Sequence, residues 1–359
     1  MAIEQAHQAS AGGRITLPAW FGELSPLGLI ALYAFAVHLA AAGIGRSRAI
    51  VWTLYLPYAA PVMLAFACFG LAVLALIGVR RFPNLSLASA LRCELERRGL
   101  KPAVLALSLP TVLAFPLFLS LFSSFKALIP ILQPFSWDAG LAELDRALHG
   151  GTDPWRYFEP LLAHPLLIRA LDFVYHPLWS LGLFVLWIWQ ALDRRRPELR
   201  LQLLLAIPMG WIVLGSIGGV VFSSAGPCYF AELGGDPDRF GPLLTRLAEI
   251  DTDWPLVSHM AQSALWGLYR SGAIGFGSGI SAMPSVHVAT AFMALLLARR
   301  YGPVPLALSL AIFVIIAVSS VLLGWHYAVD SYAGVLLVTP IWLVCGAVAR
   351  RLAVRELSQ

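Results

Sequence analysis

The chain has 359 residues, of which 59% are hydrophobic and only 13% are charged. Soluble domains usually carry about a quarter of their residues as charged side chains, so this composition excludes an ordinary water-soluble fold. The net charge of +5 does not indicate a nucleic-acid partner, because the basic residues lie beside apolar runs and form no aromatic-interleaved basic groove.

Apolar runs follow one another along the chain, each of roughly 18 or more residues and therefore long enough to cross a bilayer as a helix. The eight runs cover residues 26–43, 51–78, 102–124, 170–191, 201–223, 282–299, 303–323 and 328–348. We predict an all-α, multi-pass membrane protein with about eight transmembrane helices. The first span should stay uncleaved, because the preceding segment is long and carries more acidic than basic residues.

The basic residues predict an orientation for these spans. With a cytoplasmic N-terminus, 16 of the 25 basic residues face the cytoplasm. The two long outer loops, 125–169 and 224–281, together hold 7 basic and 11 acidic residues. Because basic residues concentrate on the cytoplasmic side of membrane proteins, we expect both termini there and these two loops on the periplasmic or lumenal side.

Four regions are predicted along the chain. They are a polar tail over 1–25, two additional spans with a basic interfacial segment over 26–101, a membrane core over 102–348, and a basic tail over 349–359. Helical spacing of apolar residues predicts surface helices within 79–101 and 137–149. The loop 224–281 is rich in Gly, Pro, Asp and Trp, and its length suggests a function such as covering a substrate. No paired cysteine, metal-binding or nucleotide-binding motif occurs, so we expect no disulfide framework, metal or cofactor.

The first candidate for chemistry is His287, at the outer end of the sixth run. Pro284 and Ser285 stand just before it, and such a pair starts a helix whose free amide groups could bind an anion. A plain helix start with an incidental histidine would have the same sequence. The interpretation therefore needs a partner residue.

The partner is His326, which lies with Asp330 in the short outer turn between the last two runs. A spacing of four places both on one helix face, so the carboxylate can hold one imidazole proton and leave the other nitrogen nucleophilic. A structural histidine satisfied by a carboxylate would look alike. The orientation favours a site, because it brings both histidine motifs to the same membrane face. Two such histidines suffice for metal-free phosphoryl transfer through a phospho-histidine, with Lys126 as the best candidate for holding the phosphate.

Three segments resemble motifs of the type 2 phosphatidic acid phosphatase superfamily, whose motifs read KxxxxxxRP, PSGH and SRxxxxxHxxxD. The matching segments are KALIPILQP at 126–134, PSVH at 284–287 and SSVLLGWHYAVD at 319–330. The resemblance implies a six-helix catalytic core, with His326 as nucleophile, Asp330 as its orienting carboxylate and His287 as acid for the leaving group. It also implies phosphate binding by Lys126, Ser285 and Gln133.

Two positions depart from that pattern. Gln133 and Ser320 stand where the family has arginine, which removes positive charge and favours a singly charged phosphodiester over a phosphomonoester. These departures, with the segments FSWD at 135–138 and GPCYF at 226–230, resemble the inositol phosphorylceramide synthase branch. That branch moves a phosphoinositol head group from phosphatidylinositol to ceramide.

Five further residues are candidates for contacting substrate: Asp138, Tyr229, Asp172, His176 and Arg270. Asp138 and Tyr229 belong to the two segments just named, and Arg270 could replace a missing arginine. Asp172 and His176 follow Arg169 at helical spacing and form a polar cluster, for which a structural ion pair with a satisfied histidine is the alternative.

The predicted function is transfer of a phosphate-bearing head group from a phospholipid donor to a lipid alcohol at the outer membrane face. Hydrolysis of a lipid phosphate or pyrophosphate by the same residues is the first alternative. A non-catalytic lipid carrier or scaffold is the second.

Overall fold

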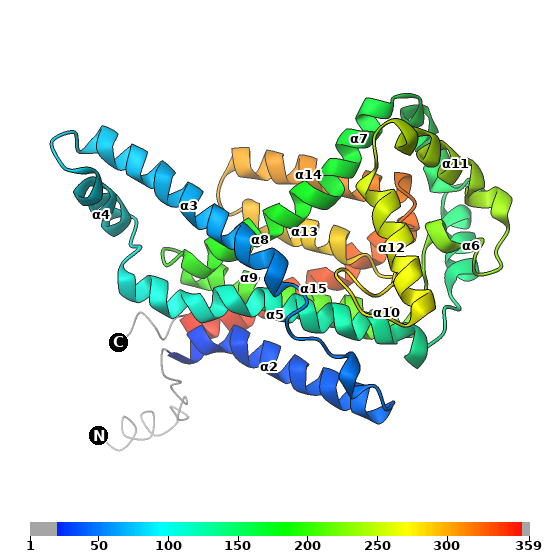
Figure 1. Ribbon diagram of the computed structural model, residues 1–359, viewed down its shortest axis with the longest axis horizontal. Coiled ribbons are helices and arrows are strands. Elements are labelled where there is room, and N and C mark those ends of the chain that lie inside the picture. Colours follow the sequence, from blue (N-terminus) through cyan, green and yellow to red (C-terminus); the bar gives the residue numbers. More distant parts are fainter. Residues whose placement is uncertain (1–19, 354–359) are drawn as a thin grey trace, which may run out of the picture.

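The computed structural model describes residues 20–353, and every regular element within them is helical (Figure 1). The all-α prediction is therefore confirmed. The longer helices are α2 Trp20–Gly43, α3 Leu56–Arg81, α4 Leu87–Arg97, α5 Pro102–Leu132, α6 Asp138–Leu148, α7 Pro165–Phe173, α8 Trp179–Leu192, α9 Pro197–Gly210, α11 Pro237–Asp253, α12 Val257–Ser271, α13 Val286–Ala298, α14 Pro303–Leu322 and α15 Ala328–Ala353. The shorter elements are η1 Ser47–Ala49, η2 Pro154–Ala163, η3 Val174–Leu178, η4 Trp211–Gly218, α10 Gly219–Val221 and η5 Pro227–Tyr229.

Seven helical segments of the described chain are long and apolar enough to cross a membrane, which indicates a multi-pass integral membrane protein. They are Leu24–Gly43, Leu56–Arg81, Pro102–Leu132, Pro165–Leu192, Pro197–Val221, Pro303–Leu322 and Ala328–Leu352. The remaining predicted span, 282–299, is the sixth along the chain and is a shorter apolar helix of 13 residues, α13. It is short at its N-terminus because Pro284 disfavours helical backbone in Met283, and because Ser285 has extended backbone and caps the helix, which therefore begins at Val286.

Several helix bounds differ from the predicted spans. The first helix begins at Trp20, so the last part of the predicted polar tail is helical, while residues 1–19 lie outside the described residues. The third extends to Leu132, which places Lys126 inside α5. The fourth continues through the π-helical turn η3, which contains Pro177. Proline lacks an amide hydrogen, and a wider turn accommodates the lost hydrogen bond without ending the helix.

Helices α9, α13 and α15 pack against one another, and α2 packs against both α9 and α5 (Figure 1). The interior of the bundle is aromatic: the Trp187 ring stacks on Phe115 with centroids 4.7 Å apart. Gly215 faces the Phe122 ring, where a Cβ would lie 2.4 Å from a ring carbon. Because lipid tails are as apolar as these side chains, close van der Waals packing at small residues holds the helices together.

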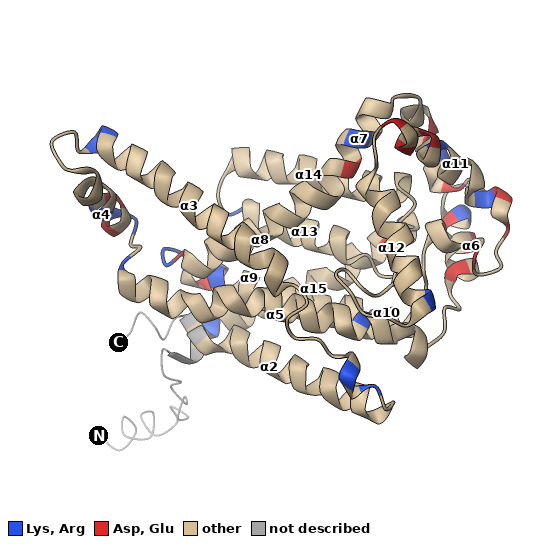
Figure 2. Cartoon of the chain, in the orientation of Figure 1, with Lys and Arg blue, Asp and Glu red and all other residues tan. Residues whose placement is uncertain are grey.

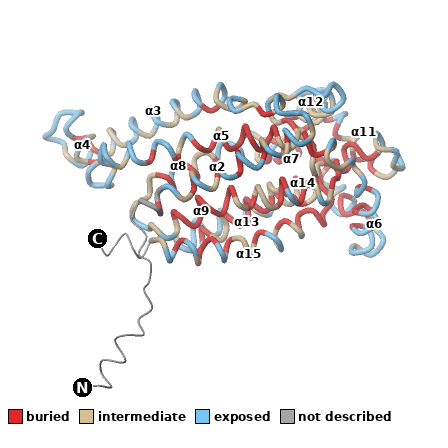
Figure 3. Tube along the Cα trace, turned by 90° about the horizontal axis from the view of Figure 1, so that it is seen from below, coloured by how far each residue is buried: buried red, intermediate tan, exposed pale blue. Residues whose placement is uncertain are grey.

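The helices α3 and α4 form a hairpin that projects from the bundle (Figure 1). Helix α4 confirms that a helix lies within 79–101, and its location at the membrane surface stays a prediction. Gly78 lets the two helices touch, since a Cβ there would lie 2.6 Å from the Ala90 carbonyl oxygen. The buried Glu94 carboxylate binds Arg97 and Arg98, each at 2.8 Å. Most side chains of α3 are exposed, as expected for a helix surrounded by lipid (Figure 3).

At the other end of the bundle, α6, α11 and α12 form a cap. The predicted loop 224–281 is thus not a plain loop, because it contains α11 and α12. Helix α6 confirms that a helix lies within 137–149, and its location on the membrane surface stays a prediction. Arg239 of α11 joins the cap by donating to Asp153 at 2.7 Å and to the Ala142 carbonyl oxygen at 2.6 Å. Acidic residues gather in this cap, whereas the middle of the bundle carries few charges (Figure 2).

Candidate functional site

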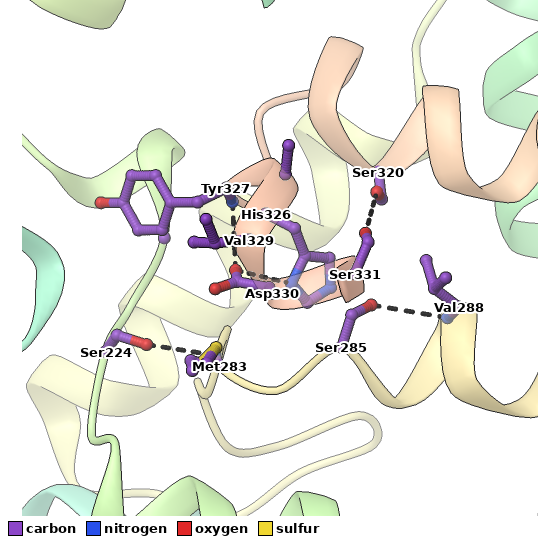
Figure 4. A network of polar contacts seen from close by, with 12 residues as sticks. Ser224, Met283, Ser285, Val288, Ser320, His326, Tyr327, Val329, Asp330 and Ser331 are labelled. Atoms are coloured by element: carbon purple, nitrogen blue, oxygen red, sulfur yellow. Dashed lines mark hydrogen bonds and ion pairs between the residues drawn. The ribbon is translucent and has the colours of Figure 1, made fainter. Parts of the chain in front are cut away.

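His326 and Asp330 meet in the turn between α14 and α15 (Figure 4). Nδ1 of His326 lies 3.2 Å from Oδ2 of Asp330, and the Tyr327 amide donates to the same oxygen at 3.0 Å. Both side chains are buried, Asp330 completely. The expected placement on one helix face is wrong, because α15 begins only at Ala328 and His326 precedes it. The pair still forms, since a side chain in the first helical turn points back toward the N-terminus.

This contact assigns the two nitrogens of the His326 ring. The ionised Asp330 carboxylate can only accept hydrogen bonds, so Nδ1 carries the proton and Nε2 keeps a free lone pair in the neutral ring. The turn itself is held by the carbonyl oxygen of Ser320, which accepts from the amides of Trp325 at 3.1 Å and His326 at 2.9 Å. Gly324, with φ of +76°, makes this reversal possible.

The N-terminus of α13 adjoins this pair. The Ser285 amide donates to the Asp330 carbonyl oxygen at 3.0 Å, and the Ser285 hydroxyl accepts from the Val288 amide at 3.4 Å. Gly334 of α15 permits the approach, because a Cβ there would lie 2.7 Å from the Ser285 carbonyl oxygen. The structure thus joins two segments that are about 40 residues apart in sequence.

His287 follows Ser285 and stacks on the buried ring of Tyr175, with centroids 5.0 Å apart and an interplanar angle of 14°. The ring lies within electrostatic range of His326, His176 and Lys126. The structure therefore brings His287, His326 and Asp330 to one end of the bundle, together with Lys126. Their chemical roles stay predictions.

Lys126 is half-buried in the last turns of α5, with Nζ 6.0 Å from the centroid of the Phe122 ring. The backbone of Gly279 lies directly against the backbone of Lys126. Gln133 ends the same helix, half-buried, and its carbonyl oxygen accepts from the Ser223 hydroxyl at 2.8 Å. Ser320, the second position that lacks an arginine, is buried, and its hydroxyl donates to the Ala317 carbonyl oxygen of the same helix at 2.7 Å. Neither position supplies a positive charge.

A second polar cluster links the cap to the His326 turn through Ser258. The Ser258 hydroxyl donates to Asp172 at 2.6 Å, so it accepts from the Trp325 indole at 3.1 Å and from Nε2 of His176 at 3.0 Å. Asp172 also accepts from the Val257 amide at 2.7 Å and thereby caps α12. His176 consequently carries a proton on Nε2 and has a hydrogen-bond partner already.

Arg169 does not belong to this cluster, contrary to the sequence interpretation. Its guanidinium donates to the Ile250 carbonyl oxygen at 3.1 Å and lies 3.9 Å from Asp253. The helical spacing to Asp172 was correct, but α11 packs close enough to attract the longer arginine side chain. Arg270 lies exposed in the last turn of α12, and no described hydrogen bond or ion pair joins it to the histidines.

Asp138 and Tyr229 lie beside the turn that carries His326. The Asp138 carboxylate accepts from the amides of Ala225 at 2.9 Å and Gly226 at 2.8 Å, and from the Tyr327 hydroxyl at 3.0 Å. Burial raises the pKa of Asp138 above its ordinary value, and these three hydrogen bonds partly offset that rise. The buried Tyr229 stacks on a neighbouring tryptophan ring at 5.0 Å.

Asp145 is a further residue of the site, which the sequence motifs do not include. This buried carboxylate accepts from the Ala328 amide at 2.9 Å and the Val329 amide at 3.0 Å, and so caps α15 directly behind His326. Burial raises its pKa more than the two amide hydrogen bonds lower it. A sequence signal existed: Asp138 and Asp145, seven residues apart, share the apolar face of α6 with Leu141.

The described cavities lie on the cap side of the turn. The larger has a volume of about 210 Å³ and does not include the histidines of the predicted site. His326 borders a much smaller one of about 10 Å³, together with Asp145 and Tyr327. The larger cavity is lined by Cys228, Tyr229, Glu232, Leu244, Leu247, Ala248, Leu256, Ser258, His259, Gln262, Ser263 and Trp266. Among the described residues, no group of three or more His, Cys, Asp or Glu side chains is arranged to hold a metal ion.

A family model described as the PAP2 superfamily matches residues 139–344, more than half of the 359 residues. The matched segment includes His287, His326, Asp330 and Asp145, whereas Lys126 precedes it. No curated protein and no solved structure matches the chain.

Proposed function

The chain belongs to the PAP2 superfamily of membrane enzymes, and we propose that it moves a phosphate-bearing head group from a phospholipid to a lipid alcohol through a phospho-histidine. The observation that carries this proposal is the His326 ring, whose Nδ1 is held by Asp330 and whose Nε2 keeps a lone pair, beside the N-terminus of α13.

In the first half-reaction, Nε2 of His326 attacks the phosphorus of the donor lipid and the bond from phosphorus to the lipid oxygen breaks. The protonated His287 gives its proton to that oxygen, so the leaving group departs as a neutral alcohol. The head group stays on His326 as a phosphoramidate. Asp330 balances the positive charge that the His326 ring gains during attack.

In the second half-reaction, the neutral His287 takes the proton from the hydroxyl of the acceptor lipid. The oxygen then attacks phosphorus, the bond between phosphorus and Nε2 breaks, and His326 returns to its neutral form. The same two imidazoles therefore serve both directions, and no metal or cofactor takes part in either step.

Backbone amides at the start of α13 can stabilise the phosphate oxygens. A helix leaves its first amides without intrahelical partners. In α13 the Val288 amide donates to the Ser285 hydroxyl, so the amides of Val286 and His287 can bind an anion. In α15 the first two amides, of Ala328 and Val329, already bind the carboxylate of Asp145, and the Tyr327 amide just before them binds Asp330. Of these two helix ends, we therefore assign the phosphate to α13.

The charge balance favours a diester as donor. Lys126 lies within electrostatic range of His287, whereas Gln133 and Ser320 are neutral where related enzymes carry arginine. A phosphodiester has one negative charge and a phosphomonoester about two near neutral pH, so one lysine and two amides suit the diester. Resemblance of the segments at 135–138 and 226–230 to inositol phosphorylceramide synthases suggests phosphatidylinositol and ceramide as the first pair to test.

The test uses purified protein in liposomes with labelled phospholipid donors, with and without ceramide or diacylglycerol, and product analysis by mass spectrometry. We expect a new phospholipid that forms only when the acceptor is present and is lost in His326→Ala. His164→Ala is the matched control, because that histidine is exposed. Release of the head group to water regardless of acceptor would replace the proposal by hydrolysis. Absence of turnover with every donor would favour a lipid carrier.

A further inference from the structure

Helix α6 presents two buried carboxylates to the turn that carries His326. Asp138 and Asp145 are seven residues apart, so they lie two turns apart on one helix face. Between them they bind the side chain of Tyr327 and the backbone of Ala328 and Val329. The three residues that follow the proposed nucleophile are thus all held by one surface helix.

The Asp145 contacts fix the start of α15. Each carboxylate oxygen accepts one amide, at 2.9 Å from Ala328 and 3.0 Å from Val329. This is side-chain capping, but the carboxylate comes from a segment 183 residues away in sequence and not from the capped helix. The negative charge of Asp145 also lies at the positive end of the α15 dipole, where it stabilises the helix. A displaced Asp145 would free the first turn of α15, and with it Asp330.

The Asp138 contacts fix the other side of the turn. Its carboxylate binds the Tyr327 hydroxyl at 3.0 Å and the amides of Ala225 and Gly226. Gly226, with φ of +100°, approaches so closely that a Cβ would lie 2.5 Å from the Trp325 carbonyl oxygen. Asp138 therefore ties the 225–226 segment and the His326 turn into one unit.

We propose that Asp138 and Asp145 are positioning residues, which hold the His326 turn in the geometry required for attack on phosphorus. This inference rests on the proposed function only for the identity of the nucleophile. It gives Asp138 a different role from the substrate contact expected from sequence, because three protein groups already occupy its oxygens. Neither carboxylate touches the reacting atoms.

A positioning role predicts a particular kinetic effect. The ring of His326 would shift relative to the bound lipid, while Lys126 and the start of α13, which contact neither carboxylate in the described structure, would still bind the phosphate. A misplacement of about 1 Å in a reacting group can cost about a hundredfold in rate. We therefore expect kcat to fall about a hundredfold in Asp145→Ala while KM changes less than about threefold.

The conservative variant Asp145→Asn should show a smaller loss of kcat than Asp145→Ala. Asparagine has one acceptor oxygen, so it can keep one of the two amides and should lose about tenfold in kcat. Glu143→Gln is the matched control, because this carboxylate lies on the same helix, is exposed and binds Arg239 instead of the turn. Equal activity of Asp145→Ala and the Glu143 control would overturn the proposal, and so would a rise in KM without loss of kcat.

Tyr327→Phe tests the Asp138 contact even if the aspartate variants fold poorly. It removes only the hydroxyl that Asp138 binds, and we expect kcat to fall about three- to tenfold. Unchanged kcat in this variant would overturn the role of Asp138.

Amide hydrogen exchange separates this inference from the proposed function. In wild-type protein the peptide spanning 325–330 should be protected, and Asp145→Ala should lose protection there but not over 286–290. That outcome supports the positioning role even if no lipid donor is turned over, in which case the proposed function alone would fail. Unchanged protection in Asp145→Ala would overturn the positioning role whatever the activity.

Discussion

Replacing Asp330 by asparagine keeps the size of the side chain and removes its charge. In the proposed reaction the His326 ring gains a positive charge 3.2 Å from the carboxylate. Two unit charges at this distance attract by about 5 kcal/mol at an effective dielectric constant of about 20, and by about 1.3 kcal/mol in water. These energies correspond to rate losses of several thousandfold and of about tenfold, at about 1.36 kcal/mol for each factor of ten.

The burial of the pair decides whether the loss in rate should lie closer to the several-thousandfold or to the tenfold value. The Asp330 side chain is fully buried and the side chain of His326 is 9% exposed, so water screens the pair little. An asparagine amide group would also meet a poor environment, since Oδ1 of Asp330 is buried without a hydrogen-bond partner in the described structure. We expect kcat to fall at least about a hundredfold in Asp330→Asn.

The assay is single-turnover transfer from a labelled phospholipid, with trapping of the phosphoryl group on the protein. Asp253→Asn serves as control, because this aspartate is 85% exposed. Thermal unfolding checks that each variant is folded. A loss of less than about threefold in folded Asp330→Asn protein would refute the reasoning that the carboxylate stabilises the charged ring.

Three further predictions concern other parts of the molecule. In a single turnover, His287→Gln should slow release of a lipid alcohol leaving group by about 10²- to 10⁴-fold, but should slow release of a nitrophenol much less, because nitrophenolate needs no proton; equal losses in the two release steps would contradict the acid role. Gly279→Ala should destabilise the protein and lower activity more than Gly277→Ala. Both glycines have positive φ, which costs an alanine about 1–2 kcal/mol, but only at 279 would a Cβ lie 2.2 Å from the Lys126 Cβ; equal melting temperatures would contradict this. Hydrogen bonds from neighbouring arginines lower the pKa of Glu94 from 4.5 to about 2. The stabilisation that Glu94 gives the α3–α4 hairpin is therefore complete above pH 4.5 and is lost as the pH falls toward 2. Amide hydrogen exchange in α4, corrected for intrinsic rates, should accordingly increase over this range in wild-type protein. It should not increase in Glu94→Gln.

The predicted helices depended on local sequence, and most are present with shifted ends. Apolar length decides whether a segment can cross a bilayer, and this property is independent of the neighbouring helices. The exceptions arise where local rules compete: Pro284 shortens the sixth run, whereas Pro177 is accommodated by a π-helical turn inside its span. Orientation in the membrane remains a prediction.

The helix at 237–253 lies in a segment whose glycine and proline content predicts a loop, although its apolar residues have an amphipathic pattern. The buried residues of α11, Phe240, Leu243, Leu247 and Ile250, recur at helical spacing. This period is typical of an amphipathic helix and outweighs the composition of the surrounding segment.

Within the candidate site, sequence alone determined what depends on neighbours along the chain. The spacing of His326 and Asp330 and the cap at Ser285 are local, and both contacts are present. Only the tertiary structure decided that Asp145 caps α15 and that Ser258 joins Asp172 to Trp325. A buried carboxylate or hydroxyl needs a partner, but which partner it finds depends on helix packing across as many as 183 residues. A sequence pattern can therefore indicate that a buried polar side chain needs a partner, but the packing of distant helices decides which residue becomes that partner.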